Sequence, residues 1–289
     1  GHPGSSYAVT LLFLISAILF ANTAFHHYAV DDFIIVQENK YVQEGLGGLG
    51  KIFTSDAFEG YYGERGKSLV AGGRYRPLSI ATFALEREIL GGLNPALSHQ
   101  VNILFFAITV VLIFLTLKRL IPPKKGTVWA SVAFLASLFY ATHPIHTEAV
   151  ANIKGRDEIM GFGFAIAAFF FLLRFVDEKR LKWWAVSVLM YALALFSKEN
   201  AITFLAVMPA GLFLLKKKNL IAAIKPVLPH VVVAAIFLLL RQQYAGSGSG
   251  IFELMNNPFL FSSSAERFGT ILRTYVEYAR LLVFPHSLS

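Results

Sequence analysis

Two adjacent carboxylates, Asp31 and Asp32, stand shortly after the first long apolar run of the chain. Charged groups at the end of a membrane helix are costly to keep near lipid, and such a pair therefore indicates a functional site. One carboxylate could take a proton from a hydroxyl group as that group attacks an electrophilic carbon. The pair could instead cap a helix, stand in a solvated loop, or bind Mg²⁺ or Mn²⁺.

Other polar clusters carry residue types that bind anions. Arg74 and Arg76 are two positions apart and are followed by Pro77, so they could present guanidinium groups to a phosphate. Arg156 and Lys198 could add positive charge. Each cluster also has a structural explanation, because the two arginines could anchor the chain to lipid headgroups and the lysine could extend its ammonium toward water.

Two histidines, His143 and His146, are three residues apart. If the preceding helix continues through them, they lie on one face and could donate protons to a leaving oxygen. They could instead end that helix before Pro144. Acids are also favoured at the start of a helix, which is the alternative role of the pair at 157 and 158. Four acids near these clusters are expected to support the site. They are Glu148, Asp157, Glu158 and Glu199.

The composition indicates a membrane protein. Of 289 residues 55% are hydrophobic and only 15% are charged, which is too apolar for a soluble domain of this size. The net charge of +8 comes largely from short basic runs between apolar segments, so it indicates membrane topology and not nucleic-acid binding. Without cysteine, the chain can form neither a disulfide nor a thiolate metal site.

The apolar runs predict an all-α polytopic fold with seven spans and an eighth, amphipathic helix that carries Glu277 and Arg280. The runs lie at about 8–25, 101–117, 128–142, 159–175, 183–196, 201–215, 227–240 and 271–284. We expect residues 1–6 to be a tag remnant and residues 7–289 to form one transmembrane domain. Residues 26–98 form a long first outer loop with short interfacial helices at 49–58 and 78–90, and 241–270 form a late outer loop.

Positive charge predicts the orientation. The connections 118–125, 174–182 and 216–225 hold 12 of the 26 Lys and Arg residues and only two of the 18 acids, so they are expected on the cytoplasmic side. All the polar clusters then share the outer side. We expect a bacterial inner membrane with a periplasmic site, or otherwise the endoplasmic reticulum with a lumenal site.

The order and spacing of these clusters resemble the transmembrane half of the TMTC family of tetratricopeptide-linked O-mannosyltransferases and their bacterial relatives. The matching segments are Val30-Asp31-Asp32-Phe33, Tyr75 to Ser79, Gly92 to Pro95, His99 to Asn102, His143 to Ala151, Gly155 to Glu158, Leu195 to Glu199 and Asn257-Pro258. No tetratricopeptide region follows within the 289 residues, and this leaves the acceptor open.

The resemblance implies a GT-C glycosyltransferase fold. Such enzymes move a monosaccharide, in this family mannose, from a polyprenyl-phosphate carrier to a hydroxyl of Ser or Thr with inversion. The family's first acid matches Asp31 as the base, and Asp32 would orient it. Relatives need no metal, although a divalent cation on the two acids stays possible. The donor phosphate would lie among Arg74, Arg76, His143, His146, Arg156 and Lys198.

Three other functions stay open at this stage. The same fold could glycosylate a lipid or a glycan instead of a protein. The chain could also be a transporter, whose outer charges would line an entry path, although its mid-span segments carry few ionisable residues. Finally, it could be a non-catalytic membrane scaffold.

Overall fold

The computed structural model describes residues 3–29, 31–63, 73–124, 128–246 and 259–285. These residues form helices joined by short turns, and no strand forms among them. The longer helices are α1 (Pro3–Leu19), α5 (Pro77–Leu90), α6 (Pro95–Leu120), α7 (Val132–Thr142), α9 (Arg156–Glu178), α10 (Leu181–Ser197), α11 (Phe204–Leu214), α13 (Leu228–Ala245) and α14 (Ser264–Val283).

Short helices and single turns connect them. The α-helices of this group are α2 (Lys40–Gln43), α3 (Leu49–Phe53), α4 (Glu59–Tyr62), α8 (Thr147–Ala151) and α12 (Leu220–Ile224). The 3₁₀ turns are η1 (Ala21–Phe25), η3 (Gly45–Gly48), η5 (Pro144–His146), η6 (Ile153–Gly155), η7 (Glu199–Thr203) and η8 (Lys225–Val227), and η2 (Phe33–Gln37) is a π turn.

Each of the seven apolar runs expected to span a membrane forms a helix. Three helical stretches, Pro95–Leu120, Ile153–Glu178 and Leu220–Ala245, are long and apolar enough to cross a membrane. At 1.5 Å per residue, 26 residues reach about 39 Å, more than the roughly 30 Å of a hydrocarbon core. Four apolar helices are shorter, namely Gly4–Leu19, Val132–Thr142, Leu181–Ser197 and Glu199–Leu214. The all-α membrane fold is thereby confirmed.

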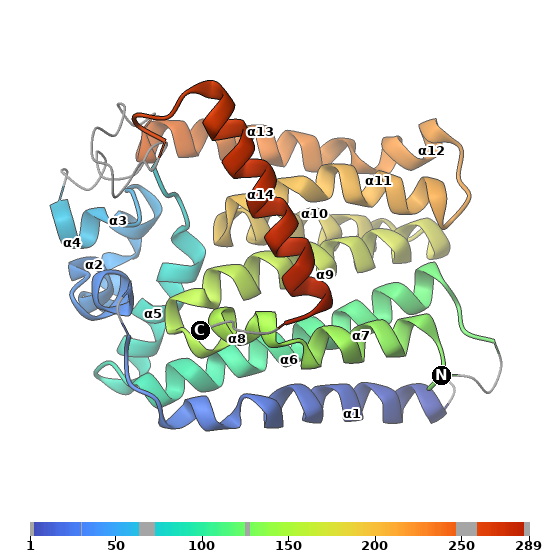
Figure 1. The fold of residues 1–289 in the computed structure, drawn as a ribbon, viewed down its shortest axis with the longest axis horizontal. Coiled ribbons are helices and arrows are strands. Elements are labelled where there is room, and N and C mark those ends of the chain that lie inside the picture. Colours follow the sequence, from blue (N-terminus) through green and yellow to red (C-terminus); the bar gives the residue numbers. More distant parts are fainter. Residues whose placement is uncertain (1–2, 30, 64–72, 125–127, 247–258, 286–289) are drawn as a thin grey trace.

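The apolar helices lie side by side along a common direction. In Figure 1 the bundle runs from α1 through α6, α7, α9, α10 and α11 to α13, and the short helices α2 to α4 gather at one end together with α5. The helix α9 lies between α6 and α10. Its glycines allow this close packing, because a Cβ on Gly163 would lie 2.4 Å from the hydroxyl of Thr109 on α6.

The three basic connections meet at the end of the bundle away from α2 to α5. Arg119 lies 3.2 Å from Asp177, and the ammonium of Lys216 lies 3.0 Å from the same carboxylate. Lys118 donates to the hydroxyl of Ser5 at 2.7 Å. We call this group the basic end. Its existence agrees with the charge pattern, since residues expected on one side of a membrane lie on one side of the molecule.

The expected interfacial helices in the first outer loop are present as α3 and α5, although α3 ends at Phe53 and is shorter than expected. A small core of buried apolar side chains from η2, α2, α3 and α5 holds them together, with Val36, Val42 and Phe83 at its centre. The loop thus has a core of its own beside the bundle.

The two histidines do not share the face of a continuing helix, and of the two alternatives the structure has the one in which the helix ends before Pro144. The helix α7 ends at Thr142, and His143 has an extended backbone with φ −73° and ψ 124°. The cause is Pro144, whose ring disfavours helical geometry in the residue before it. The chain then turns through η5, so His146 comes from a separate turn.

The last helix, α14, crosses one face of the bundle at a steep angle to the other helices (Figure 1). It begins with a capping box between Ser263 and Glu266, and none of its residues is buried. Phe268 and Leu272 lie on one side of this helix, and Arg273 and Glu277 lie on the other. The eighth helix is therefore amphipathic, as expected, and begins seven residues earlier than predicted.

Candidate active site

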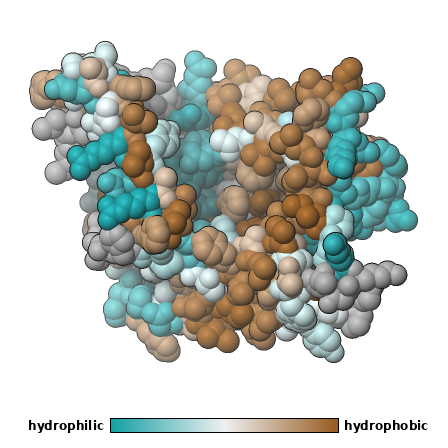
Figure 2. Space-filling model, turned by 45° about the vertical axis from the view of Figure 1, so that its right-hand side comes forward, coloured by the Kyte–Doolittle hydropathy of each residue, from teal (hydrophilic) through white to brown (hydrophobic). Residues whose placement is uncertain are grey.

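A cavity of about 730 Å³ opens at the end of the bundle opposite to the basic end. Figure 2 shows that the apolar surface is hollowed, with hydrophilic groups deeper within. The walls come from the segment after α1, the segment before α5, the stretch from η5 to α9, and η7, with side chains from α6, α7 and α11. Eight of the predicted site residues line this site cavity: Asp31, Arg74, Arg76, His146, Glu148, Asp157, Glu158 and Lys198.

Asp31 and Asp32 have different surroundings. The side chain of Asp31 is 48% exposed and lines the cavity, and one carboxylate oxygen lies 2.5 Å from the ammonium of Lys154. Asp32 is buried and accepts hydrogen bonds from the backbone N–H groups of Ala29 and Lys154, at 2.9 and 2.7 Å. Burial raises the pKa of Asp32, although both hydrogen bonds oppose this rise. Only Asp31 can meet a substrate.

Arg76 joins three elements around the cavity. Its guanidinium donates to Asp157 at 2.7 Å and makes two hydrogen bonds with Glu199, at 2.9 and 2.7 Å. Burial alone would lower the pKa of Arg76, but the ion pairs with Glu199 and Asp157 outweigh it and hold the pKa above its ordinary value. All three guanidinium nitrogens are thus engaged, and Glu199 supports Arg76 without lining the cavity.

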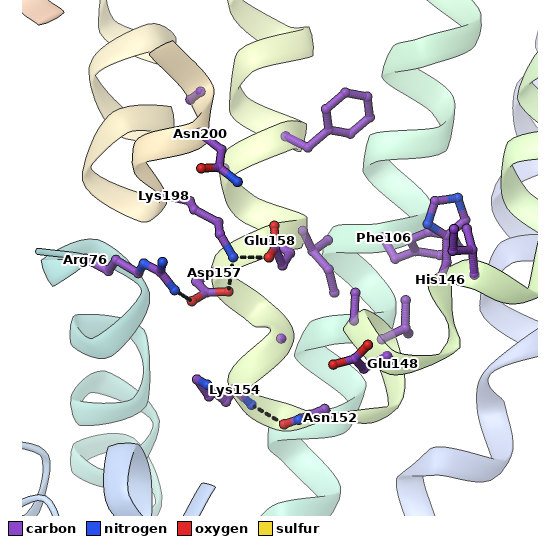
Figure 3. Close-up of a pocket in the computed structure, with 18 of the residues that line it drawn as sticks. Arg76, Phe106, His146, Glu148, Asn152, Lys154, Asp157, Glu158, Lys198 and Asn200 are labelled. Carbon is purple, nitrogen blue, oxygen red and sulfur yellow. Dashed lines mark hydrogen bonds and ion pairs between the residues drawn. The ribbon is translucent and has the colours of Figure 1, made fainter. Parts of the chain in front are cut away.

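Lys198 is buried next to Asp157, one of the two acids that Arg76 binds. Its ammonium lies 3.6 Å from Asp157 and also pairs with Glu158 (Figure 3). A Cβ on Gly161 would lie 2.8 Å from the Cβ of Lys198, so α9 and the lysine pack closely. Its positive charge is therefore already compensated.

Arg74 is held mainly by its backbone, and its guanidinium lies over the ring of Phe58, 5.2 Å from the centroid. Its N–H donates to Asp56 at 2.6 Å, and its carbonyl accepts from Ala57 at 2.8 Å. The next residue, Tyr75, is buried and donates to the carbonyl of Phe53 at 2.8 Å. Arg74 lines the cavity, yet its guanidinium forms no ion pair or hydrogen bond with any residue that the structure describes.

Arg156 is not brought into the cavity. Its side chain is fully buried and donates to Asn102, Thr82, Glu86 and the carbonyl of Ser98 at 2.5 to 2.9 Å. With every guanidinium nitrogen engaged below the surface, it joins α5, α6 and α9. Its predicted role in binding phosphate is not supported by this placement.

The two histidines also differ. His143 is buried outside the cavity, where one ring nitrogen accepts from the N–H of Ile145 and the other lies 3.1 Å from the carbonyl of Leu282 on α14. His146 lines the cavity, with its ring 4.0 Å from that of Tyr140. Burial, aided by His143, lowers the pKa of His146 to about 4, so its ring is neutral at pH 7. It can donate a hydrogen bond but supplies no charge.

The two aspartates do not fit a shared divalent cation. Both oxygens of Asp32 accept from backbone N–H groups, and the ammonium of Lys154 lies where a cation on Asp31 would be. Mg²⁺ needs several oxygen ligands in octahedral geometry. Within the described ranges, no three His, Asp or Glu side chains come together in a way that could hold a metal ion.

Sequence reasoning missed Lys154 and the aromatic wall. Lys154 immediately precedes the motif from Gly155 to Glu158. The only sign of its role in the sequence is that it is a second basic residue, besides Arg156, close to the acids at 157 and 158. Phe106, Tyr140 and Phe162 line the cavity but look like ordinary packing residues of membrane helices in the sequence. The motif Asn257-Pro258 lies outside the described residues.

The chain is similar in sequence to several known proteins. The human Protein O-mannosyl-transferase TMTC3 is 28% identical across 97% of this chain and 32% of its own length. The corresponding values are 24%, 89% and 39% for mouse Protein O-mannosyl-transferase TMTC4, and 31%, 60% and 18% for human Protein O-mannosyl-transferase TMTC1. No solved structure matches.

The chain spans about a third of the length of the first of these relatives. Residues 87–241, more than half of the chain, match the family described as dolichyl-phosphate-mannose-protein mannosyltransferase. The predicted resemblance is confirmed, and the chain belongs to this family.

Proposed function

We propose that this chain transfers mannose from a polyprenyl-phosphate carrier to a Ser or Thr hydroxyl of a protein, with inversion at the sugar carbon. The observation that carries the proposal is that Asp31, a half-exposed carboxylate, shares one cavity with Arg74, a cation that has no carboxylate partner among the described residues. The family and the names of the relatives support mannose and a protein acceptor.

Asp31 acts as the base. One of its oxygens is held by Lys154, and the other makes no hydrogen bond with a described residue, so it is open to an acceptor hydroxyl. As the hydroxyl oxygen attacks the anomeric carbon, its proton passes to Asp31, and the bond from that carbon to the phosphate oxygen breaks. The electron pair leaves with the lipid phosphate. Attack from the side opposite the phosphate inverts the carbon.

Arg74 is the first contact of the donor phosphate. The cations that line the cavity are Arg74, Arg76, Lys154 and Lys198, and the last three are already paired with carboxylates. A guanidinium binds phosphate through charge-assisted hydrogen bonds. Arg76 and Lys198 can bind the phosphate only by giving up part of these ion pairs. Their first role is therefore to stabilise the cavity wall.

The carrier's hydrocarbon tail leaves along the apolar part of the cavity. Phe162 and Phe204 line it, and their rings lie 6.0 Å apart. The two rings pack edge to face, and both belong to helices expected to be in the membrane, α9 and α11, so a lipid chain can lie along them toward the bilayer. If the basic end faces the cytoplasm, the cavity opens on the periplasmic or lumenal side.

The test is transfer by purified Asp31→Asn protein, with a polyprenyl-phosphate mannose and a Ser- and Thr-containing peptide. Loss of a general base is expected to slow transfer by roughly 10²- to 10⁴-fold. Glu44→Gln is the matched control, because Glu44 is an exposed acid outside the cavity. Unchanged transfer by Asp31→Asn would refute the role of Asp31, and mannose appearing only on a lipid or glycan would refute the protein acceptor.

A further inference from the structure

One carboxylate of the cavity stands apart from the other three. Asp31 pairs with Lys154, and the acids at 157 and 158 pair with the cations at 76 and 198. Glu148 also lines the cavity and is exposed, but its carboxylate forms neither an ion pair nor a hydrogen bond with any side chain or N–H group that the structure describes. The carboxylate of Glu148 is therefore available to a bound ligand.

The position of Glu148 favours such a partner. Figure 3 shows its carboxylate extending into the cavity from α8, with no interaction drawn to it. Its backbone carbonyl accepts from the N–H of Asn152 at 3.1 Å. The helix thus holds the residue at its main chain and leaves the side chain available.

The charge of Glu148 restricts what it can bind. An ionised carboxylate only accepts hydrogen bonds, and its two oxygens can accept from two neighbouring hydroxyl groups. It would repel the phosphate of the donor, which Arg74 attracts. A hexose phosphate bound with its phosphate at Arg74 therefore directs its hydroxyl-bearing side toward Glu148.

The aromatic side chains nearby suit the same ligand. Tyr140 and His146 lie with ring centroids 4.0 Å apart, and Phe106 stacks on Tyr140 at 5.9 Å. All three line the cavity together with Glu148. A hexose has apolar C–H faces and a rim of hydroxyl groups, so an aromatic wall beside a free carboxylate matches both of its surfaces.

We propose that Glu148 is a specificity-determining residue that accepts hydrogen bonds from hydroxyl groups of the transferred hexose, an inference that rests on the proposed function. The residue does not remove the acceptor proton. It fixes the sugar in the cavity and discriminates against donors that lack the hydroxyl groups it binds.

The test compares kcat/KM for polyprenyl-phosphate mannose with that for its 2-, 3- and 4-deoxy analogues. Wild-type protein is expected to discriminate against at least one deoxy donor by roughly tenfold to a hundredfold, the range for a hydrogen bond to a charged group. In Glu148→Ala this discrimination disappears, because mannose loses the contact that the deoxy donor never made. The control Glu44→Ala keeps it.

Two outcomes overturn the proposal. Discrimination that persists in Glu148→Ala shows that Glu148 does not contact the missing hydroxyl, and activity of Glu148→Ala that equals wild type on all donors shows no contact at all. If Glu148→Ala does not fold, Glu148→Gln, which keeps the side-chain shape, is expected to lose part of the discrimination. Absence of transfer from every donor by wild-type protein contradicts the proposed function itself, a result distinct from these.

Discussion

The ammonium of Lys154 lies 2.5 Å from the carboxylate of Asp31, and the backbone N–H of the same residue lies 2.7 Å from Asp32. One residue therefore contacts both acids in different ways. The side chain holds the exposed carboxylate, and the main chain holds the buried one. This arrangement makes Lys154 a positioning residue for the proposed base.

Replacing Lys154 by methionine separates the two contacts. The backbone N–H remains for Asp32, while the ion pair with Asp31 is lost. We expect kcat for transfer to fall by roughly tenfold to a hundredfold, because a misplaced catalytic group costs about this much. The donor KM should change little, since Lys154 already has a carboxylate partner. Lys154→Arg should recover part of kcat, and a rise in KM at constant kcat would show that Lys154 binds the donor.

Arg74 and Arg76 should respond differently to the same substitution. Arg74→Gln removes a cation that pairs with no described carboxylate and only contacts the ring of Phe58, so the donor KM is expected to rise by roughly tenfold to a hundredfold with little change in thermal stability. Arg76→Gln takes from Glu199 its ion-pair partner and leaves Asp157 with Lys198 alone, so the unfolding temperature should fall.

Donor titrations and thermal unfolding of the purified variants separate these two effects. Arg180→Gln, an exposed arginine at the basic end, is the control and should change neither property. If both cavity variants raise KM equally and Arg76→Gln is as stable as wild type, then Arg74 is not the first phosphate contact and Arg76 is not a structural residue.

Arg156 is expected to matter for stability and not for binding. Arg156→Met leaves Glu86 with an uncompensated charge in a largely buried position, which should cost about 3–5 kcal/mol of unfolding free energy. A second substitution, Glu86→Leu, removes that charge and should recover part of the loss. Denaturant unfolding in detergent measures both. A raised donor KM in an Arg156→Met protein of normal stability would instead support the prediction from the sequence that Arg156 binds the donor phosphate.

The apolar runs and the basic connections were sufficient to predict the helices and the grouping of polar clusters at one end. Both follow from local composition, since a run of about 20 apolar residues must span and its polar flanks must lie at its ends. The joining of residues 76, 157 and 199 by ion pairs shows that these clusters also meet in space.

Side-chain direction could not be predicted in the same way. Lys154 and Arg156 are two residues apart, yet the first faces the cavity and the second is buried among three helices. The difference arises because η6 turns the chain just before α9 begins, and a sequence does not reveal such a turn. For His143 the signal was present, since the following proline predicts a helix end.

His146 should make the protein sensitive to mild acid. Its pKa is lowered to about 4 in the folded protein, against an ordinary value near 6.5, because the ring is largely buried and faces His143. Below pH 6.5 the unfolded chain therefore binds a proton that the folded chain does not, so stability is lost as pH falls from about 6.5 to 4. The loss is at most about 3–4 kcal/mol, at 1.36 kcal/mol for each unit by which the pKa is lowered. Between pH 7.5 and 5, the melting temperature of His146→Phe should fall less than that of the wild type. The control is His27→Phe, at an exposed histidine, whose melting temperature should fall as much as that of the wild type. An equal fall in all three proteins would show that His146 does not cause the acid sensitivity.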